Sequence, residues 1–355
     1  FVYVSNAADG DIGTYRMQSD GALQPGARVK AGDIVGPLAV SPDRRFLYAA
    51  TRSKPCSVWV YAIDPGTGAL APRSVSPLAE SFPYISLDKT GRYLFGASYH
   101  AHLISVNAVG ADGSVAAPPL QLIPVGRNAH SIRTDESNRY VFVPTLGNDL
   151  MFQFSFDAST GRLCSNTPAV VQLQPGTGPR HFVTSADNKF MYVLSELLAT
   201  VTTFALDART GLLTEIGLAS GLPRDTKLVP GAPRAAVGAT AAGPSPNRDC
   251  NIWAADIHLT PDGRFLYVSE RTGSTLGAFS VNAETGKLTY LGSTPTESQP
   301  RGFAIAPNGG FLVACGEKSD TISVYAIDQA SGALSRLRKY PGGKGANWVE
   351  IVSFA

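Results

Sequence analysis

The chain repeats a pair of apolar runs that a short polar turn separates. In the clearest copy, WAADIHLTPDGRFLYV at residues 253–268, apolar and polar positions alternate up to Pro261-Asp262-Gly263, and a second apolar run follows from Phe265. Proline fixes φ, the Asp side chain can bond nearby backbone amides and glycine accepts a positive φ, so these three residues predict a tight turn. The unit therefore predicts a β-hairpin.

The same hairpin recurs at five other places, which begin at Gly36, Phe82, Asn128, Gly178 and Gln299. We call the first aromatic residue of each second strand the marker. The markers are separated by 47, 47, 50, 75 and 46 residues and are Phe46, Tyr93, Tyr140, Phe190, Phe265 and Phe311. A period in the forties with several strands per unit predicts a β-propeller.

A second phrase, rich in Asp, Thr, Ser and Gly, follows an alternating strand in every unit and is typical of a hairpin loop. Its seven copies are Asp64–Leu70, Asp157–Leu163, Asp207–Leu213, Asn282–Leu288, Asp328–Leu334 and the shorter Ser19–Leu23 and Ala111–Val115. The missing seventh hairpin is supplied by the chain ends, because residues 1–4 match a second strand and residues 345–352 match a first strand. We therefore expect an all-β, seven-bladed β-propeller with four-stranded blades, a single domain over residues 1–355 whose ring closes by pairing of the N- and C-terminal strands.

One step of the repeat is longer than the others, and its excess lies at about residues 221–251. The centre of this stretch is rich in Gly, Pro and Ala, which predicts a long loop. Loops of this length are either functional covers or mobile insertions, and the sequence favours neither.

The charge of the chain bears on its partners, and its cysteines bear on its compartment. The net charge is +2, with no basic tract for nucleic acid or anionic lipid and no run of eighteen apolar residues, so we expect neither a nucleic-acid nor a membrane partner. The four cysteines have no paired spacing and are interpreted as free thiols in a reducing compartment. A cytoplasmic monomer or weak homo-oligomer is the expectation; the alternative is an exported protein whose signal has been removed, since the chain starts without Met inside a strand.

The repeat also predicts a site. The start of the first strand and the end of the second lie at one end of each blade, so these positions face one mouth of the central channel. The start-of-strand position holds Gly36, Pro83, His130, Arg180, Ala255 and Arg301. The position six residues after the marker holds Arg52, Tyr99, Leu146, Glu196, Arg271, Glu317 and, in the shared blade, Ala7.

A purely structural position would hold similar residues in each copy, whereas these two positions collect charge. Arginines beside a carboxylate and an imidazole suit an anionic substrate in which a carbonyl oxygen gains charge, with Glu196 or His130 as general base. The structural alternative is that Glu196 and Glu317 only form salt bridges with arginines at the mouth. His258 is interpreted as a hydrogen-bonded core residue. Three other histidines near the mouth are candidates for supporting groups, although an ordinary structural role is favoured for each: His100, His102 and His181.

The residues also carry a family resemblance. The stretches 253–272 and 295–328, the phrases GTGPRHF and Ser195-Glu196-Leu197, and the closing GANWVEIV resemble the bacterial propeller-type 6-phosphogluconolactonases. These belong to the seven-bladed lactonase family that also includes fungal carboxymuconate-lactonizing enzymes. The resemblance covers essentially the whole chain and is strongest from Trp253 to Tyr325; the insertion departs from it.

The resemblance implies a carboxylic-ester hydrolase without cofactor or metal, in which His130, Arg180, Glu196 and Arg271 match the family's functional positions. Arg52, Tyr99, Arg301 and Glu317 are the expected substrate-binding residues. The expected partner is a small anionic sugar lactone, foremost 6-phosphoglucono-1,5-lactone. Two alternatives stay open: a muconate-type cycloisomerase that uses the same groups, and a non-catalytic propeller scaffold.

Overall fold

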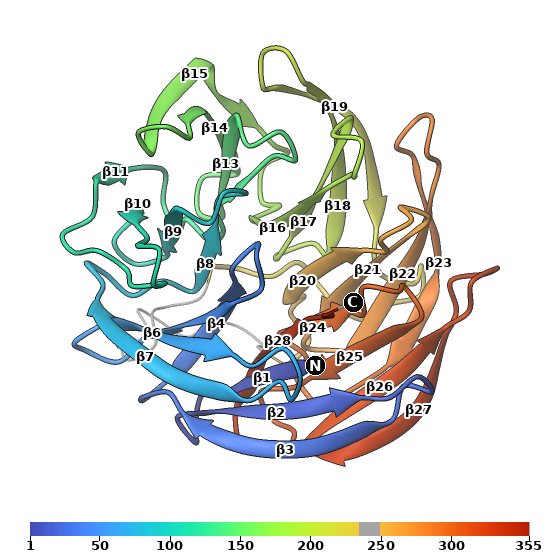
Figure 1. Cartoon of the computed structure of the whole chain (residues 1–355). Helices are drawn as coiled ribbons and strands as arrows, with labels where there is room; N and C mark the ends of the chain where they lie inside the picture. Colours follow the sequence, from blue (N-terminus) through green and yellow to red (C-terminus); the bar gives the residue numbers. More distant parts are fainter. Residues whose placement is uncertain (234–248, 355) are drawn as a thin grey trace.

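The computed structural model describes residues 1–233 and 249–354, and these residues form seven antiparallel sheets of four strands each. The sheets stand in a ring as the blades of a propeller (Figure 1). We number the blades from the one that contains the chain's first strand. Every pairing inside a blade is antiparallel, so the expected all-β, seven-bladed fold with four-stranded blades is confirmed.

The innermost strands begin each blade and the outermost strands end it. Blade 1 consists of β28 (Ala346–Ile351), β1 (Val2–Asn6), β2 (Asp11–Met17) and β3 (Leu23–Lys30). Blade 2 consists of β4 (Val35–Val40), β5 (Phe46–Thr51), β6 (Ser57–Ile63) and β7 (Leu70–Pro77). Blade 3 consists of β8 (Tyr84–Leu87), β9 (Tyr93–Ser98), β10 (Leu103–Ala108) and β11 (Gln121–Pro124).

The remaining blades follow the same order. Blade 4 consists of β12 (Arg133–Thr134), β13 (Tyr140–Thr145), β14 (Leu150–Asp157) and β15 (Arg162–Gln172). Blade 5 consists of β16 (Pro179–Thr184), β17 (Phe190–Ser195), β18 (Thr200–Asp207) and β19 (Leu212–Ser220). Blade 6 consists of β20 (Ala254–Leu259), β21 (Phe265–Glu270), β22 (Thr275–Val281) and β23 (Leu288–Pro295), and blade 7 of β24 (Phe303–Ile305), β25 (Phe311–Cys315), β26 (Thr321–Ile327) and β27 (Leu334–Pro341).

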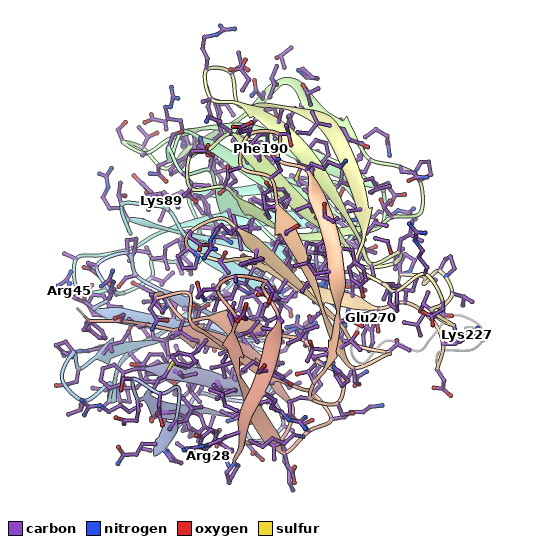
Figure 2. All side chains as sticks on the ribbon, turned by 90° about the vertical axis from the view of Figure 1, so that its right-hand side faces the viewer. Arg28, Arg45, Lys89, Phe190, Lys227 and Glu270 are labelled. Atoms are coloured by element: carbon purple, nitrogen blue, oxygen red, sulfur yellow. The ribbon has the colours of Figure 1, made fainter. Side chains whose placement is uncertain are left out.

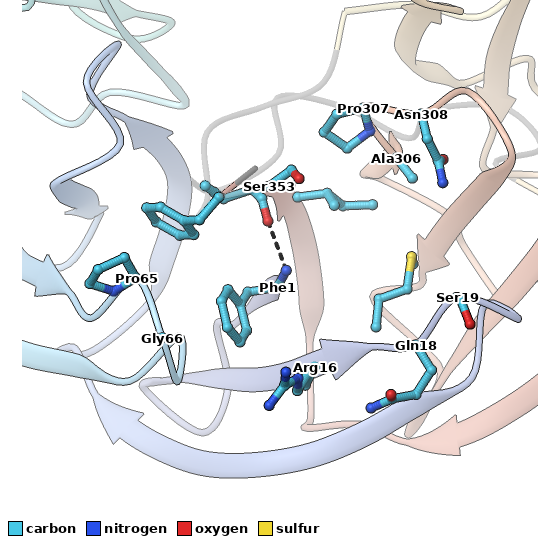
Figure 3. A pocket seen from close by; sticks show the side chains of 14 residues that line it. Phe1, Arg16, Gln18, Ser19, Pro65, Gly66, Ala306, Pro307, Asn308 and Ser353 are labelled. Carbon is cyan, nitrogen blue, oxygen red and sulfur yellow. Dashed lines mark hydrogen bonds between the residues drawn. The ribbon is translucent and has the colours of Figure 1, made fainter.

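The two chain ends close the ring as predicted. Strands β1 and β28 pair antiparallel, with Val2 opposite Ile351 and Val4 opposite Val349. The N-terminal ammonium of Phe1 donates a hydrogen bond of 2.7 Å to the carbonyl of Val352, inside a pocket of about 360 Å³ (Figure 3). Pairing removes the open sheet edge that a terminal blade would otherwise present to solvent.

The two repeated phrases of the sequence meet across the blade boundaries. Each of the six markers is the first residue of its strand, and its ring packs against the glycine in the β-hairpin loop of the following blade. At Gly211, where φ is +70°, an added Cβ would lie 2.1 Å from the ring of Tyr140. The six pairs of a marker ring and a glycine are Phe46 with Gly113, Tyr93 with Gly161, Tyr140 with Gly211, Phe190 with Gly286, Phe265 with Gly332 and Phe311 with Gly21. In blade 1, the ring of Phe1 lies against Gly68 in the same way.

Arginine side chains reinforce several of these contacts. The guanidinium of Arg139 lies 5.5 Å from the centroid of the Tyr140 ring and donates a hydrogen bond to the carbonyl of Ala208 in the next blade. The hydroxyl of Tyr140 donates to the carbonyl of Arg209 in the same loop. The blades are therefore joined by a repeated contact as well as by apolar packing between their faces.

The flanks of the insertion belong to the packed structure. Leu222 and Ile252 are buried in the apolar cluster between blades 5 and 6, and Leu228 packs against it. The amide of Ile252 donates a 2.8 Å hydrogen bond to the carbonyl of Val229. The described ends of the stretch 221–251 therefore pack against blades 5 and 6. Most of the centre that the sequence predicts as a long loop, 234–248, lies outside the described residues.

Candidate active site

A cavity of about 160 Å³ lies at one mouth of the channel. In the side view, Arg45 and Lys89 lie on one face of the propeller, and Glu270, the neighbour of Arg271, lies toward the opposite face (Figure 2). The structure brings all eight residues predicted for the site around this cavity, together with Pro83, His100 and Trp253. The eight are Arg52, Tyr99, His130, Arg180, Glu196, Arg271, Arg301 and Glu317.

Backbone hydrogen bonds explain why the two sequence positions converge. The amide six residues after the marker donates to a carbonyl just before the first strand of the same blade: Glu196 to Gly178 at 2.8 Å, Arg271 to Trp253 at 3.1 Å and Glu317 to Gln299 at 3.0 Å. The bond fixes the end of the second strand beside the start of the first. The predicted register is therefore confirmed for the backbone.

The carboxylate of Glu196 is the centre of the cavity wall. Its side chain is only 4% exposed, and its Oε2 lies 2.7 Å from Nε of Arg180 and 3.0 Å from Nη2 of Arg271. Its Oε1 accepts a 3.0 Å hydrogen bond from the indole Nε1 of Trp253. One buried carboxylate thus joins two guanidiniums from neighbouring blades, so these ion pairs are shielded from solvent, unlike an exposed salt bridge.

His130 lies next to this ion pair as a buried, neutral imidazole. Burial, with Arg180 and His181 alongside, holds the pKa of His130 well below its usual value of 6.5. Its Nε2 is 4.0 Å from Oε2 of Glu196, which is beyond a hydrogen bond, and its Nδ1 has no hydrogen-bond partner among the described residues. The imidazole therefore keeps a lone pair at neutral pH.

Arg180 is fully buried and is oriented from several sides. Its Nη1 donates to the carbonyl of Ala255 and lies 3.0 Å from Nε2 of His181, whose Nδ1 is 2.9 Å from Oδ1 of Asp256. Its Nη2 has no partner among the described residues. Burial, with Arg271 nearby, lowers the pKa of Arg180 to about 9, so the group remains a cation at neutral pH with one donor to spare.

Arg52 and Arg301 add positive charge to the lining of the cavity. Burial, with Arg301 nearby, lowers the pKa of Arg52 to about 10, and Nε of Arg52 has no partner in the described part of the chain. Nε of Arg301 lies 3.6 Å from Oε1 of Glu317. Four guanidiniums against two carboxylates leave the lining of the cavity with a formal charge of +2, because His130 is neutral.

The other histidines fall into different places. His100 lines the cavity, and Nδ1 of His102 accepts a hydrogen bond from the amide of Asn128 outside it. His258 is hydrogen-bonded to Asp256 at 3.1 Å, as expected, but its side chain is 32% exposed in a second channel cavity of about 320 Å³. The interpretation of His258 as a core residue is therefore wrong, because the inner strand turns this side chain into the channel.

Within residues 1–233 and 249–354, no three His, Cys, Asp or Glu side chains are grouped so that they could hold a metal ion. The same residues contain no helix of the length and apolarity needed to cross a membrane.

Comparison with known proteins places the chain in a family. The family model described as "Lactonase, 7-bladed beta-propeller" matches residues 1–351. The chain belongs to this lactonase family. Among the relatives of this lactonase-family chain is a Serratia proteamaculans protein named 6-phosphogluconolactonase, 38% identical over 352 residues that cover 99% of this chain and 98% of the relative.

Solved structures agree with that assignment. The Pseudomonas aeruginosa periplasmic gluconolactonase is similar at a TM-score of 0.85 and 28% identity, with 98% of each chain covered. A putative 6-phosphogluconolactonase from Bacteroides fragilis is similar at a TM-score of 0.84 and 25% identity, with 99% of this chain and 97% of that one covered. The resemblance stated from the sequence is confirmed over the full length of this lactonase-family chain.

Sequence reasoning missed one residue of the site in this lactonase-family protein. Trp253 comes directly before β20, and its indole contacts both Glu196 and Arg271. The equivalent carbonyl positions in three other blades are occupied by Ile34, Gly178 and Gln299. An aromatic residue at a position without aromatic counterparts was the available signal, and it was not used.

Proposed function

We propose that the protein hydrolyses a sugar-acid lactone and that its substrate is 6-phosphoglucono-1,5-lactone, which gives 6-phosphogluconate. The observation that carries this proposal is a buried neutral imidazole beside a guanidinium with an unused donor, both on the wall of one cavity. Hydrolysis of an ester needs a base for water and a donor for the carbonyl oxygen. The names of the relatives, 6-phosphogluconolactonase and gluconolactonase, support this reaction class.

In the proposed reaction His130 is the general base. Glu196 is a poor candidate for that role, because Arg180, Arg271 and Trp253 already donate to its two oxygens. With donors already at both oxygens, Glu196 has no oxygen left over to accept the proton of a water molecule. Glu196 instead keeps the two guanidiniums side by side without mutual repulsion.

The proposed hydrolysis uses one water molecule and the side chains of His130 and Arg180. Water adds to the lactone carbonyl carbon while His130 takes its proton, and Arg180 stabilises the negative charge that forms on the carbonyl oxygen. The tetrahedral intermediate then collapses, the ring C–O bond breaks, and the departing oxygen takes the proton back from His130. The new carboxylic acid ionises and releases one proton to solvent.

The positive wall formed by Arg52 and Arg301 is the proposed binding place of the substrate's phosphate. A phosphate monoester carries a charge of about −1.5 to −2 at neutral pH, which matches the +2 charge of the cavity lining. The unpartnered Nε of Arg52 is a donor available to such an anion. Tyr99 and Glu317 complete the proposed substrate-binding set at this end.

A substrate panel tests the proposal. We expect hydrolysis of 6-phosphoglucono-1,5-lactone above the spontaneous rate, with kcat/KM about 10²-fold higher than for glucono-1,5-lactone. Arg52→Met should reduce this preference for the phosphorylated lactone at least tenfold, whereas Arg45→Met on the opposite face should not. Turnover of a carboxymuconate in place of any lactone would make the protein a cycloisomerase, and no turnover of either would favour the scaffold.

The proposed location of the protein is the cytoplasm, and its proposed oligomeric state is a monomer or weak homo-oligomer. Cys56, Cys164 and Cys315 are free thiols, and Cys56 and Cys315 are buried, which suits a reducing compartment. The periplasmic gluconolactonase marks the alternative location. Cell fractionation and sedimentation of the purified chain test the two statements.

A further inference from the structure

Trp253 makes two different contacts with the groups of the site. Its indole Nε1–H donates to Oε1 of Glu196 at 3.0 Å. Its ring lies under the guanidinium of Arg271, whose carbon is 3.6 Å from a ring centroid, and its carbonyl accepts a 3.0 Å hydrogen bond from Nε of the same arginine. One side chain therefore contacts both the carboxylate and a cation that pairs with it.

The hydrogen bond determines which way the carboxylate faces. The terminal torsion of a glutamate is broad, so a carboxylate bonded through one oxygen can rotate about its axis. In Glu196, Arg180 and Arg271 share Oε2, and Trp253 binds Oε1. With both oxygens held, the carboxylate plane stays between the two guanidiniums.

The ring determines where Arg271 lies. A guanidinium over the face of an indole is attracted by the negative π-surface, and Trp is the side chain for which this attraction is strongest. Arg271 also donates from Nη2 to the carbonyl of Ala254 at 3.0 Å, so it is held to the same short segment of chain. The cation is thereby kept in the cavity wall.

The backbone on both sides supports this arrangement. The amide of Gly231 donates a 2.8 Å hydrogen bond to the carbonyl of Leu197, the residue after Glu196. The amide of Ile252, the residue before Trp253, donates to Val229 at 2.8 Å. The described flank of the insertion is therefore hydrogen-bonded to the neighbours of both Glu196 and Trp253.

We propose that Trp253 is a positioning residue of the lactonase reaction: it fixes Glu196 and Arg271 so that the ion pair presents Arg180 and His130 to the substrate. The inference rests on the proposed function. Trp253 takes no part in proton transfer, because its indole N–H is neither a base nor an acid at neutral pH.

Two substitutions separate the two contacts. Trp253→Phe keeps a ring under Arg271 and removes the N–H donor, so kcat on 6-phosphoglucono-1,5-lactone should fall about tenfold with KM within about twofold of wild type. Trp253→Leu removes both contacts, so kcat/KM should fall about 10²-fold with a raised KM. Both variants should melt within a few degrees of wild type, which separates positioning from general loss of structure.

Trp348 provides the matched control. Its indole Nε1 also donates to a carboxylate, Glu350, at 2.9 Å, but it lies in the second channel cavity and not in the site cavity. Trp348→Phe therefore removes the same kind of hydrogen bond, and kcat should stay within twofold of wild type.

Fluorescence gives a readout that does not depend on turnover. The chain has three tryptophans, so a variant with Trp59→Phe and Trp348→Phe emits from Trp253 alone. Adding 6-phosphogluconate should change that emission if the indole lies in the occupied site. If the wild type hydrolyses the lactone and Trp253→Phe keeps kcat within twofold of wild type, the positioning role alone is overturned. The same holds if the emission of Trp253 does not change when calorimetry shows that the product binds. Absence of any lactone hydrolysis by the wild type overturns the proposed function and this inference with it.

Discussion

The substitution Glu196→Gln tests how the site is held together. Glutamine keeps the shape of the side chain but removes the charge that lies 2.7 Å from Arg180 and 3.0 Å from Arg271. An exposed pair would contribute about 0–1 kcal/mol to stability. Because the Glu196 side chain is only 4% exposed, its loss leaves two buried cations without their anion, and breaking a buried pair from one side costs about 3–5 kcal/mol.

The expected result can be measured in two ways. At about 2 °C per kcal/mol, near the lower end for a large domain, the melting temperature should fall by about 6–10 °C. Lactone hydrolysis, corrected for spontaneous opening and measured well below the melting temperature, should fall by about 10²-fold or more, because the two guanidiniums then repel each other at the reacting carbonyl.

A buried glutamate outside the cavity separates stability from activity. Glu297 is 1% exposed and accepts hydrogen bonds from the hydroxyls of Thr321 and Ser323, and it does not line the site. Glu297→Gln should lower the melting temperature and leave kcat within about twofold of wild type. A Glu196→Gln protein that melts within about 2 °C of wild type and hydrolyses the lactone within about threefold would refute the reasoning.

Two further predictions concern the base and the blade contacts. His130→Asn should lower kcat by about 10²- to 10⁴-fold. Because the pKa of His130 in the folded protein is lowered, the wild-type base becomes protonated, and activity is lost, only as the pH falls through a value well below 6.5, so kcat/KM should be flat from pH 8 to 6.5. A loss of kcat/KM toward acid pH with its midpoint at or above 6.5 would contradict the assignment of His130 as the base. Gly211→Ala and Gly263→Ala place a Cβ at nearly the same φ, +70° and +73°, but only the first meets a ring, that of Tyr140. By thermal melting both should lose about 1–2 kcal/mol to backbone strain, and Gly211→Ala about 1–3 kcal/mol more; equal losses would show that the ring contact contributes nothing.

The pattern of the sequence determined the architecture because a propeller repeats one local arrangement. Strand starts, hairpin turns and the outer loops depend on residues close in sequence, so Phe46, Tyr140 and Phe265 could each be predicted as the first residue of a strand. The same periodicity predicted which positions meet at the mouth, since a residue at a given step of each blade returns to the same height around the ring. All eight predicted site residues line the cavity for this reason.

The tertiary structure alone decided which of those residues are buried, which of them form ion pairs and which protonation state they have. Whether Glu196 is an exposed salt-bridge partner or a buried anion shared by two arginines depends on burial and on side-chain directions in different blades, which have no local sequence signal. The neutral state of His130 likewise depends on desolvation by surrounding blades and on Arg180 beside it. Trp253 enters the site because the segment after the insertion directs its indole toward Glu196, a contact between residues 57 positions apart that no periodicity specifies.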